Sequence, residues 1–206
     1  MMRILPRRCW MSWRTRGAAV AVMADVRQVV SMDLKRAGDR LFVVGATRDE
    51  LGGSEYCLYR GVSAGRVPRV YPETARACMA ALSRAMAAGL VRACHDLSEG
   101  GLAVAAAEMA FAGGLGADIG LGDVPLGEPI SRPDVLLFSE SNSRFLVEVS
   151  PDNVGLFRAL FGGLPCAEVG VVEADPSVRF FDRDGKAVLE APIDELKAAW
   201  KRPLDW

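Results

Sequence analysis

A carboxylate stands where a strand should end and a helix should begin. The segment Ala93–Leu102 reads Ala-Cys-His-Asp-Leu-Ser-Glu-Gly-Gly-Leu, after an apolar run and before an alanine-rich helical pattern. Amide groups at a helix start attract anions such as phosphate. A phosphate there would repel Asp96 unless a cation such as Mg²⁺ lay between them. The segment therefore suggests a site for a nucleotide with a metal ion.

The same ten residues also fit an explanation that needs no ligand. Asp96 is followed three residues later by Glu99, which is the spacing of a capping box. Helix caps are commoner than binding sites, so on this segment alone the cap is the favoured interpretation. Gly100 and Gly101 fit either a tight strand-to-helix turn or close approach of the backbone to a phosphate.

The elements around this segment predict a mixed α/β fold. Apolar and β-branched runs predict strands, and apolar residues at helical spacing, preceded by proline and ended by glycine, predict helices. Asp184-Gly185 marks a hairpin. Such an order indicates a layered mixed sheet flanked by helices. Strands are expected at 41–45, 90–94, 117–121, 144–149, 167–172, 178–182 and 187–190, and helices at 72–88, 99–112, 151–161 and 192–200.

Three stretches are less regular. Residues 20–32 are apolar and β-branched, which predicts one or two strands around Asp25. Residues 135–138 form a short apolar run for which helix and strand remain equally open. Residues 1–20 are an atypical start, rich in arginine with two tryptophans, which we expect to be disordered, and residues 21–206 form one domain.

Composition excludes several classes of function. With 25 Lys plus Arg against 26 Asp plus Glu in 206 residues, nothing indicates binding to nucleic acid or to a membrane surface. The five cysteines form no CxxC pair, which speaks against a zinc knuckle or a disulfide framework and favours a reducing cytoplasm. Because His95 is the only histidine, a multi-histidine metal site is excluded.

Three segments, taken in order, go beyond generic spacing. They are Asp-Glu-Leu-Gly-Gly-Ser-Glu-Tyr at 49–56, His-Asp-Leu-Ser-Glu-Gly-Gly-Leu-Ala-Val at 95–104 with Glu-Met-Ala-Phe-Ala-Gly at 108–113, and Leu-Phe-Ser-Glu-Ser-Asn-Ser-Arg-Phe-Leu-Val at 137–147. Together they resemble the last domain of the phosphoribosylformylglycinamidine synthase family, within the aminoimidazole ribonucleotide synthetase superfamily. The resemblance runs from about residue 21 to the end, and the tail at 191–200 is similar to the C-terminus of that family.

The resemblance implies an aminoimidazole ribonucleotide synthetase C-terminal-like domain of an ATP-dependent ligase in purine biosynthesis. That enzyme converts formylglycinamide ribonucleotide, with glutamine-derived ammonia, to the amidine. Its cofactors are ATP or ADP and Mg²⁺, and its partners are the remaining synthetase domains, a glutaminase subunit and a small accessory subunit. This chain resembles the domain that faces the auxiliary nucleotide site, so it is expected to be inactive alone and to carry no catalytic residue.

Carried over position by position, the resemblance gives Asp96 the role of a magnesium ligand. It gives a nucleotide contact to Ser98, with Gly100 and Gly101 beside it. The segment Glu140-Ser141-Asn142 falls where the catalytic half of the family binds substrate, but here an ion pair between Glu140 and Arg144 is the favoured interpretation. His95 is expected to be a packed or hydrogen-bonded neighbour of Asp96 rather than a general base.

Two other classes stay open. The chain could be a non-catalytic scaffold or interaction module that docks with absent domains, or another member of the aminoimidazole ribonucleotide synthetase superfamily. The domain that supplies the other metal carboxylates in the family has no counterpart here, since no Gly-Asn-x-Ser segment occurs. We therefore also expect a poorly covered apolar face where that domain would pack.

Overall fold

The structure is a computed structural model that describes residues 25–204. The expectations for residues 1–20, and for the part of the predicted strand region before Asp25, lie outside that range. The strands are β1 (Arg40–Val44), β2 (Val91–Asp96), β3 (Gly116–Gly120), β4 (Phe145–Val149), β5 (Cys166–Glu173), β6 (Ser177–Phe181) and β7 (Ala187–Pro192). The α-helices are α1 (Glu55–Tyr59), α2 (Pro72–Ala87), α3 (Gly101–Gly113), α4 (Pro133–Phe138), α5 (Val154–Leu160) and α6 (Ile193–Lys201).

The seven strands form one mixed sheet in the order β2-β4-β1-β5-β3-β6-β7. The β3–β6 pair is parallel and every other neighbouring pair is antiparallel. The predicted hairpin joins β6 to β7, with Asp182 Oδ1 accepting from the amides of Asp184 and Lys186. The mixed α/β fold predicted from the sequence is therefore confirmed.

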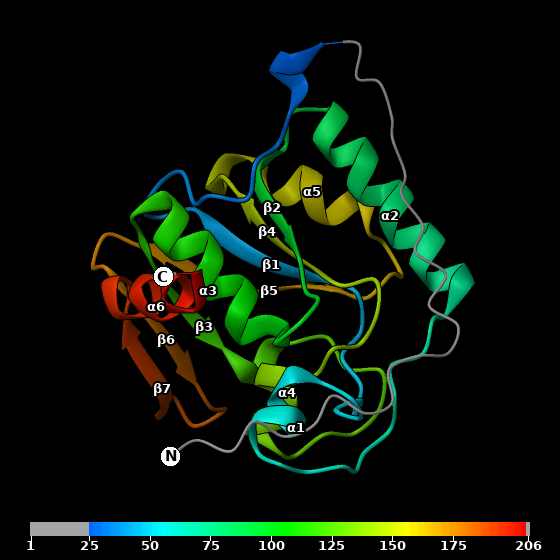
Figure 1. Cartoon of the computed structure of the whole chain (residues 1–206). Coiled ribbons are helices and arrows are strands. Elements are labelled where there is room, and N and C mark those ends of the chain that lie inside the picture. Colours follow the sequence, from blue (N-terminus) through cyan, green and yellow to red (C-terminus); the bar gives the residue numbers. More distant parts are fainter. Residues whose placement is uncertain (1–24, 205–206) are drawn as a thin grey trace.

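Helices cover both faces of the sheet (Figure 1). Successive side chains of a strand point to opposite faces, so β1 contributes to two cores. Leu41 and Val43 pack in the cluster that includes α3, whereas Phe42 and Val44 pack in the cluster that includes α2 and α5. The helix α6 lies beside α3 on the first face. β1 is therefore an interior strand that is buried on both faces of the sheet.

The structure corrects one element and decides another. Where strands were expected, Val26–Gln28 form a short 3-10 helix, and Asp25 caps it by accepting from the amide of Arg27. Val26 is 79% exposed, so its β-branched side chain finds no sheet to join. The ambiguous run at 135–138 belongs to helix α4, which begins at Pro133. Within residues 25–204, the helices are all too short or too polar to cross a membrane.

Two buried acids, Glu148 and Asp39, lie where the turn before β1 packs against the sheet. The Glu148 carboxylate is fully buried and accepts hydrogen bonds from the amides of Lys35 and Arg36. Asp39 is also buried, and its Oδ2 lies 3.0 Å from Nε of Arg92. The pKa of Glu148 is raised to about 7, chiefly by burial and also by the neighbouring Asp39 carboxyl, while the two amides oppose the shift.

We expect this pair to make the fold less stable as pH rises through neutrality. The folded state keeps a proton on Glu148 that the unfolded state releases, because the pKa rises from 4.5 to about 7 on folding. The free energy of unfolding should therefore fall by up to about 3 kcal/mol between these two values and then level off. Urea denaturation at a series of pH values measures this slope.

The Glu148→Gln variant should flatten that slope, because Gln does not titrate. Glu168→Gln, which removes an exposed partner of Arg158, is the matched control and should leave the slope unchanged. Carboxylates with lowered pKa values, such as Asp33, lose their stabilising effect only at more acidic pH and so do not confuse the result. Equal slopes in wild type and Glu148→Gln would contradict the assignment.

Candidate functional site

The aspartate singled out by the sequence stands at the end of an edge strand. Asp96 is the last residue of β2, which lies at one end of the sheet. Its side chain is 61% exposed, and its Oδ1 lies 3.4 Å from Nδ1 of His95. No hydrogen bond joins it to α3. Asp96 is therefore an exposed carboxylate at the strand-to-helix junction, with His95 beside it.

The capping box predicted for this junction is wrong. The helix α3 begins at Gly101, and its N-cap is Gly100, in a left-handed conformation with φ of 78° and without a side-chain cap. The amide of Gly100 donates instead to Oε1 of Glu140, over 2.9 Å. A partner from another part of the chain thus replaces the local cap. The same contact takes the amide that we expected to lie beside a phosphate.

Glu140 connects the starts of two helices. Its Oε1 also accepts from the amide of Glu55, the first residue of α1, over 3.0 Å. The predicted ion pair between Glu140 and Arg144 does not form. The guanidinium of Arg144 donates to the carbonyl oxygens of Ser139 and Ser141 and to Thr47 Oγ1. Glu140 instead accepts from two backbone amides, and the buried Arg144 donates to backbone and hydroxyl oxygens.

Ser141, Asn142 and Ser98, which the sequence also indicated as candidates, lie in different surroundings. Ser141 is buried, and its hydroxyl donates to Oε2 of Glu50 over 2.6 Å. Asn142 is exposed and lies beside a different, small hollow near Gly45 and Tyr71. Ser98 is exposed in the loop between β2 and α3. The structure therefore brings Glu140 and the α3 start together, but it does not gather Glu140, Ser141 and Asn142 into one site.

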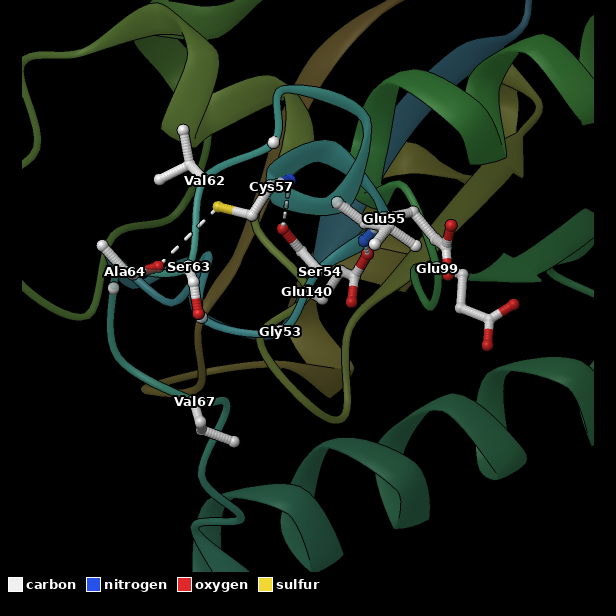
Figure 2. A pocket seen from close by; sticks show the side chains of 14 residues that line it. Gly53, Ser54, Glu55, Cys57, Val62, Ser63, Ala64, Val67, Glu99 and Glu140 are labelled. Atoms are coloured by element: carbon white, nitrogen blue, oxygen red, sulfur yellow. Dashed lines mark hydrogen bonds between the residues drawn. The ribbon is translucent and has the colours of Figure 1, made fainter. Parts of the chain in front are cut away.

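A hollow of about 930 Å³ lies beside Glu140. Its walls come from the start of α1, from the following loop and from the turn before α3. Figure 2 shows Glu55, Glu99 and Glu140 along one side of the hollow, across from Val62, Ala64 and Val67. The concentration of carboxylates makes this side acidic, so it favours cations or hydrogen-bond donors over a bare anion.

Residues that the sequence interpretation did not single out shape this region. Ser54 caps α1 by accepting from the amide of Cys57, and the carboxylate of Glu50 accepts from the amide of Arg69. Glu108 of α3 lies 2.7 Å from Nε2 of His95. Glu50 and Ser54 lie within the 49–56 segment that carries the family resemblance, and that resemblance could have marked them as residues of this region. Glu108 likewise begins the quoted 108–113 segment, but nothing in the sequence connected it to His95.

The donor set fits a shared magnesium site and does not make a complete one. Among residues 25–204, no three His, Cys, Asp or Glu side chains stand close enough to hold a metal ion together. Mg²⁺ commonly takes one or two protein carboxylates and completes its shell with phosphate oxygens and water. Asp96, exposed and nearly unpartnered, suits such a ligand. His95 lies between the two carboxylates, 3.4 Å from Asp96 and 2.7 Å from Glu108.

These features define a layered α/β domain with an incomplete acidic site at the edge of its sheet. The chain belongs to the family described as AIR synthase related protein, C-terminal domain, which matches residues 36–183. It is 35% identical over 188 residues to phosphoribosylformylglycinamidine synthase subunit PurL of Caldanaerobacter subterraneus, which covers 90% of this chain and 25% of that protein. It is 44% identical over 134 residues to the PurL subunit of Moorella thermoacetica, covering 65% of this chain and 18% of that protein.

Solved structures give the same family and the same partial coverage. T. maritima PurL complexed with FGAR superposes with a TM-score of 0.75 at 27% identity, over 83% of this chain and 30% of that chain. T. maritima PurL complexed with ATP gives 0.69 at 27% identity, over 83% and 27%. E. coli HypE, a hydrogenase maturation protein, gives 0.57 at 19% identity, which shows a shared fold alone. The chain thus spans about a quarter of the length of the PurL proteins it matches.

Proposed function

We propose that this chain is the C-terminal domain of the synthetase that converts formylglycinamide ribonucleotide to its amidine in purine biosynthesis. The complete enzyme is an ATP-dependent ligase that uses glutamine-derived ammonia. The domain contributes one wall of a nucleotide site and is inactive alone. No observation favours a separate non-catalytic module or another superfamily activity, since the likeness to HypE reaches only the fold.

One observation carries the proposal. The match to the PurL subunit of C. subterraneus covers 90% of this chain at 35% identity but only a quarter of that protein. The incomplete acidic site agrees with this, because Asp96 stands without the further ligands that a metal–nucleotide site needs. A domain of this kind requires a second surface to finish its site.

In the proposed site, Asp96 and Ser98 face a nucleotide that another domain also contacts. Asp96 would hold Mg²⁺, which supplies positive charge between the carboxylate and the phosphate oxygens. The exposed hydroxyl of Ser98 can donate to a phosphate. The amide of Gly100 stays with Glu140 in this scheme, so Gly100 and Gly101 serve the turn and not the phosphate.

The partners follow from the same assignment. They are the remaining synthetase domains, the glutaminase subunit and the small accessory subunit, with which the chain would work in the cytoplasm. A T. maritima assembly named PurLQS has been solved, and its chain matches this one over 83% of this chain's length at 26% identity. This supports an assembly of several subunits.

A chimaera tests the function directly. The last quarter of the M. thermoacetica PurL subunit is replaced by residues 21–206 of this chain, and phosphate release is followed with ATP, Mg²⁺, ammonia and formylglycinamide ribonucleotide. We expect release that depends on the ribonucleotide, and none from this chain alone. A chimaera that folds as judged by circular dichroism but is inactive, beside an active parent protein, would refute the proposal. Sustained release by the isolated chain would refute the expected dependence on other domains.

Asp96→Asn should abolish magnesium-dependent nucleotide binding. The substitution keeps the size of the side chain and removes the charge that Mg²⁺ needs. Calorimetry with Mg²⁺ and ADP should show weak binding to the wild-type chain and none to the variant. Asp152→Asn, at another exposed carboxylate, is the control and should bind as the wild type does. Tight nucleotide binding that survives Asp96→Asn would remove the metal role of Asp96.

A further inference from the structure

A chain of polar contacts links the C-terminal helix to the carboxylate at the strand end. The indole Nε1–H of Trp200, on α6, donates to Oε1 of Glu108 over 3.1 Å. The other oxygen of Glu108 lies 2.7 Å from Nε2 of His95. Nδ1 of His95 then lies 3.4 Å from Oδ1 of Asp96. Three elements, α6, α3 and β2, therefore contribute to one connected set of side chains.

For a neutral ring, the shortest of these contacts favours a proton on Nε2 of His95. An ionised carboxylate only accepts hydrogen bonds, so a neutral imidazole that contacts Glu108 must present Nε2–H to it. Nδ1 is then unprotonated and faces Asp96. The indole occupies the second oxygen of Glu108, which stops the carboxylate from rotating away. The hydrogen-bond network thus assigns a tautomer to His95.

We infer that Glu108 and Trp200 are positioning residues that hold His95 in the Nε2–H tautomer and thereby leave the oxygens of Asp96 available to a cation. This inference rests on the proposed function, because it gives Asp96 the role of a metal ligand. In the opposite tautomer, Nδ1–H would donate to Asp96 and compete with the cation for the same oxygen. In metalloproteins, carboxylates outside the ligand set commonly accept from one ring nitrogen of a histidine and so fix its tautomer and orientation.

The burial and packing around Glu108 support its role in orienting His95. The side chains of His95 and Glu108 are 17% and 23% exposed, so water competes only partly for their contact. The Trp200 ring lies against Phe111, with ring centroids 5.8 Å apart, so packing as well as the hydrogen bond holds the indole. Trp200→Phe keeps this packing and removes only the N–H. Glu108→Gln keeps the size of the side chain but leaves a single oxygen to accept from both the Trp200 indole and Nε2–H of His95.

The experiment reads the tautomer and metal binding separately. Nitrogen-15 correlation spectra of the His95 ring, recorded at about pH 8.5 on the full chain, identify the protonated nitrogen. Mn²⁺ chloride is the metal probe, read through broadening of the Asp96 and His95 signals. We expect Nε2–H in the wild type and Nδ1–H as the major form in Glu108→Gln. We also expect roughly tenfold weaker Mn²⁺ binding in that variant.

Controls separate this role from a general loss of structure. Glu195→Gln, at an exposed acid of α6, should change neither reading. Trp200→Phe should shift the tautomer in the direction of Glu108→Gln, and each variant must retain the wild-type circular dichroism. A wild-type His95 protonated at Nδ1, or an unchanged tautomer in Glu108→Gln, overturns the inference. A changed tautomer with unchanged Mn²⁺ binding overturns the claim that the His95 tautomer governs the access of a cation to Asp96.

Discussion

Arg144→Met is expected to lower the free energy of unfolding by about 3 to 5 kcal/mol. Arg144 is only 1% exposed, and its guanidinium donates to Ser139, Ser141 and Thr47. Burial lowers its pKa to about 10, against the opposing effect of Glu50 and Glu140, so the group is charged at neutral pH. Methionine fills a similar volume but leaves three acceptors without a donor.

Urea denaturation measures this loss of stability, and two further variants serve for comparison. Arg144→Lys keeps the charge but offers a single nitrogen, so it should lose about half as much stability. Arg132→Met is the control, because Arg132 is 61% exposed and its ion pair with Asp134 should contribute less than about 1 kcal/mol. Similar losses in Arg144→Met and Arg132→Met would show that the buried guanidinium does not organise the 139–141 segment.

Gly101→Ala should cost about 3 kcal/mol or more and should disturb the start of α3. Gly101 has a φ of 63°, a conformation that costs an ordinary residue about 1 to 2 kcal/mol. A Cβ atom at this position would also lie 2.9 Å from the carbonyl oxygen of Leu137 and nearer still to that of Ser139. Both obstacles are backbone atoms, so the segment before Glu140 must shift to admit a methyl group.

Gly89→Ala separates the two causes of this loss. Gly89 has a similar φ of 69°, but no atom lies within 4 Å of the position that its Cβ would take. It should therefore show the backbone cost alone, about 1 to 2 kcal/mol. The comparison is made by thermal and urea denaturation of both variants. If Gly101→Ala were no worse than Gly89→Ala, the close packing of α3 against the 137–139 segment would be disproved.

The regular elements could be predicted because their signals are local. Leu41–Val44 alternate between two cores, and Pro72 begins α2 as a proline at a first helical position does. The strands expected around Asp25 failed for the opposite reason. A β-branched residue such as Val26 favours a strand only when a neighbouring strand accepts it, and that depends on the rest of the chain.

The candidate site was predicted only in part, because local patterns place single residues but not the contacts between distant segments. Asp96 at a strand end could be placed from the adjoining patterns, and it lies there. The capping box failed because Glu140 reaches the amide of Gly100 from another segment of the chain. Glu108 could not be connected to His95 without the packing of α3 on β2. Local spacing therefore identified the ligand candidate but not the contacts that orient it.

The order of the strands also bears on how the chain reaches its native state. Arg40, at the start of the interior strand β1, is paired with Val149 on one side and with Val171 on the other. Contacts between residues so distant in sequence form slowly, because the intervening loop must close first. This part of the sheet therefore forms only after these distant segments have come together. We expect Phe42 and its neighbours to stay uncovered until then, which leaves apolar surface exposed during folding.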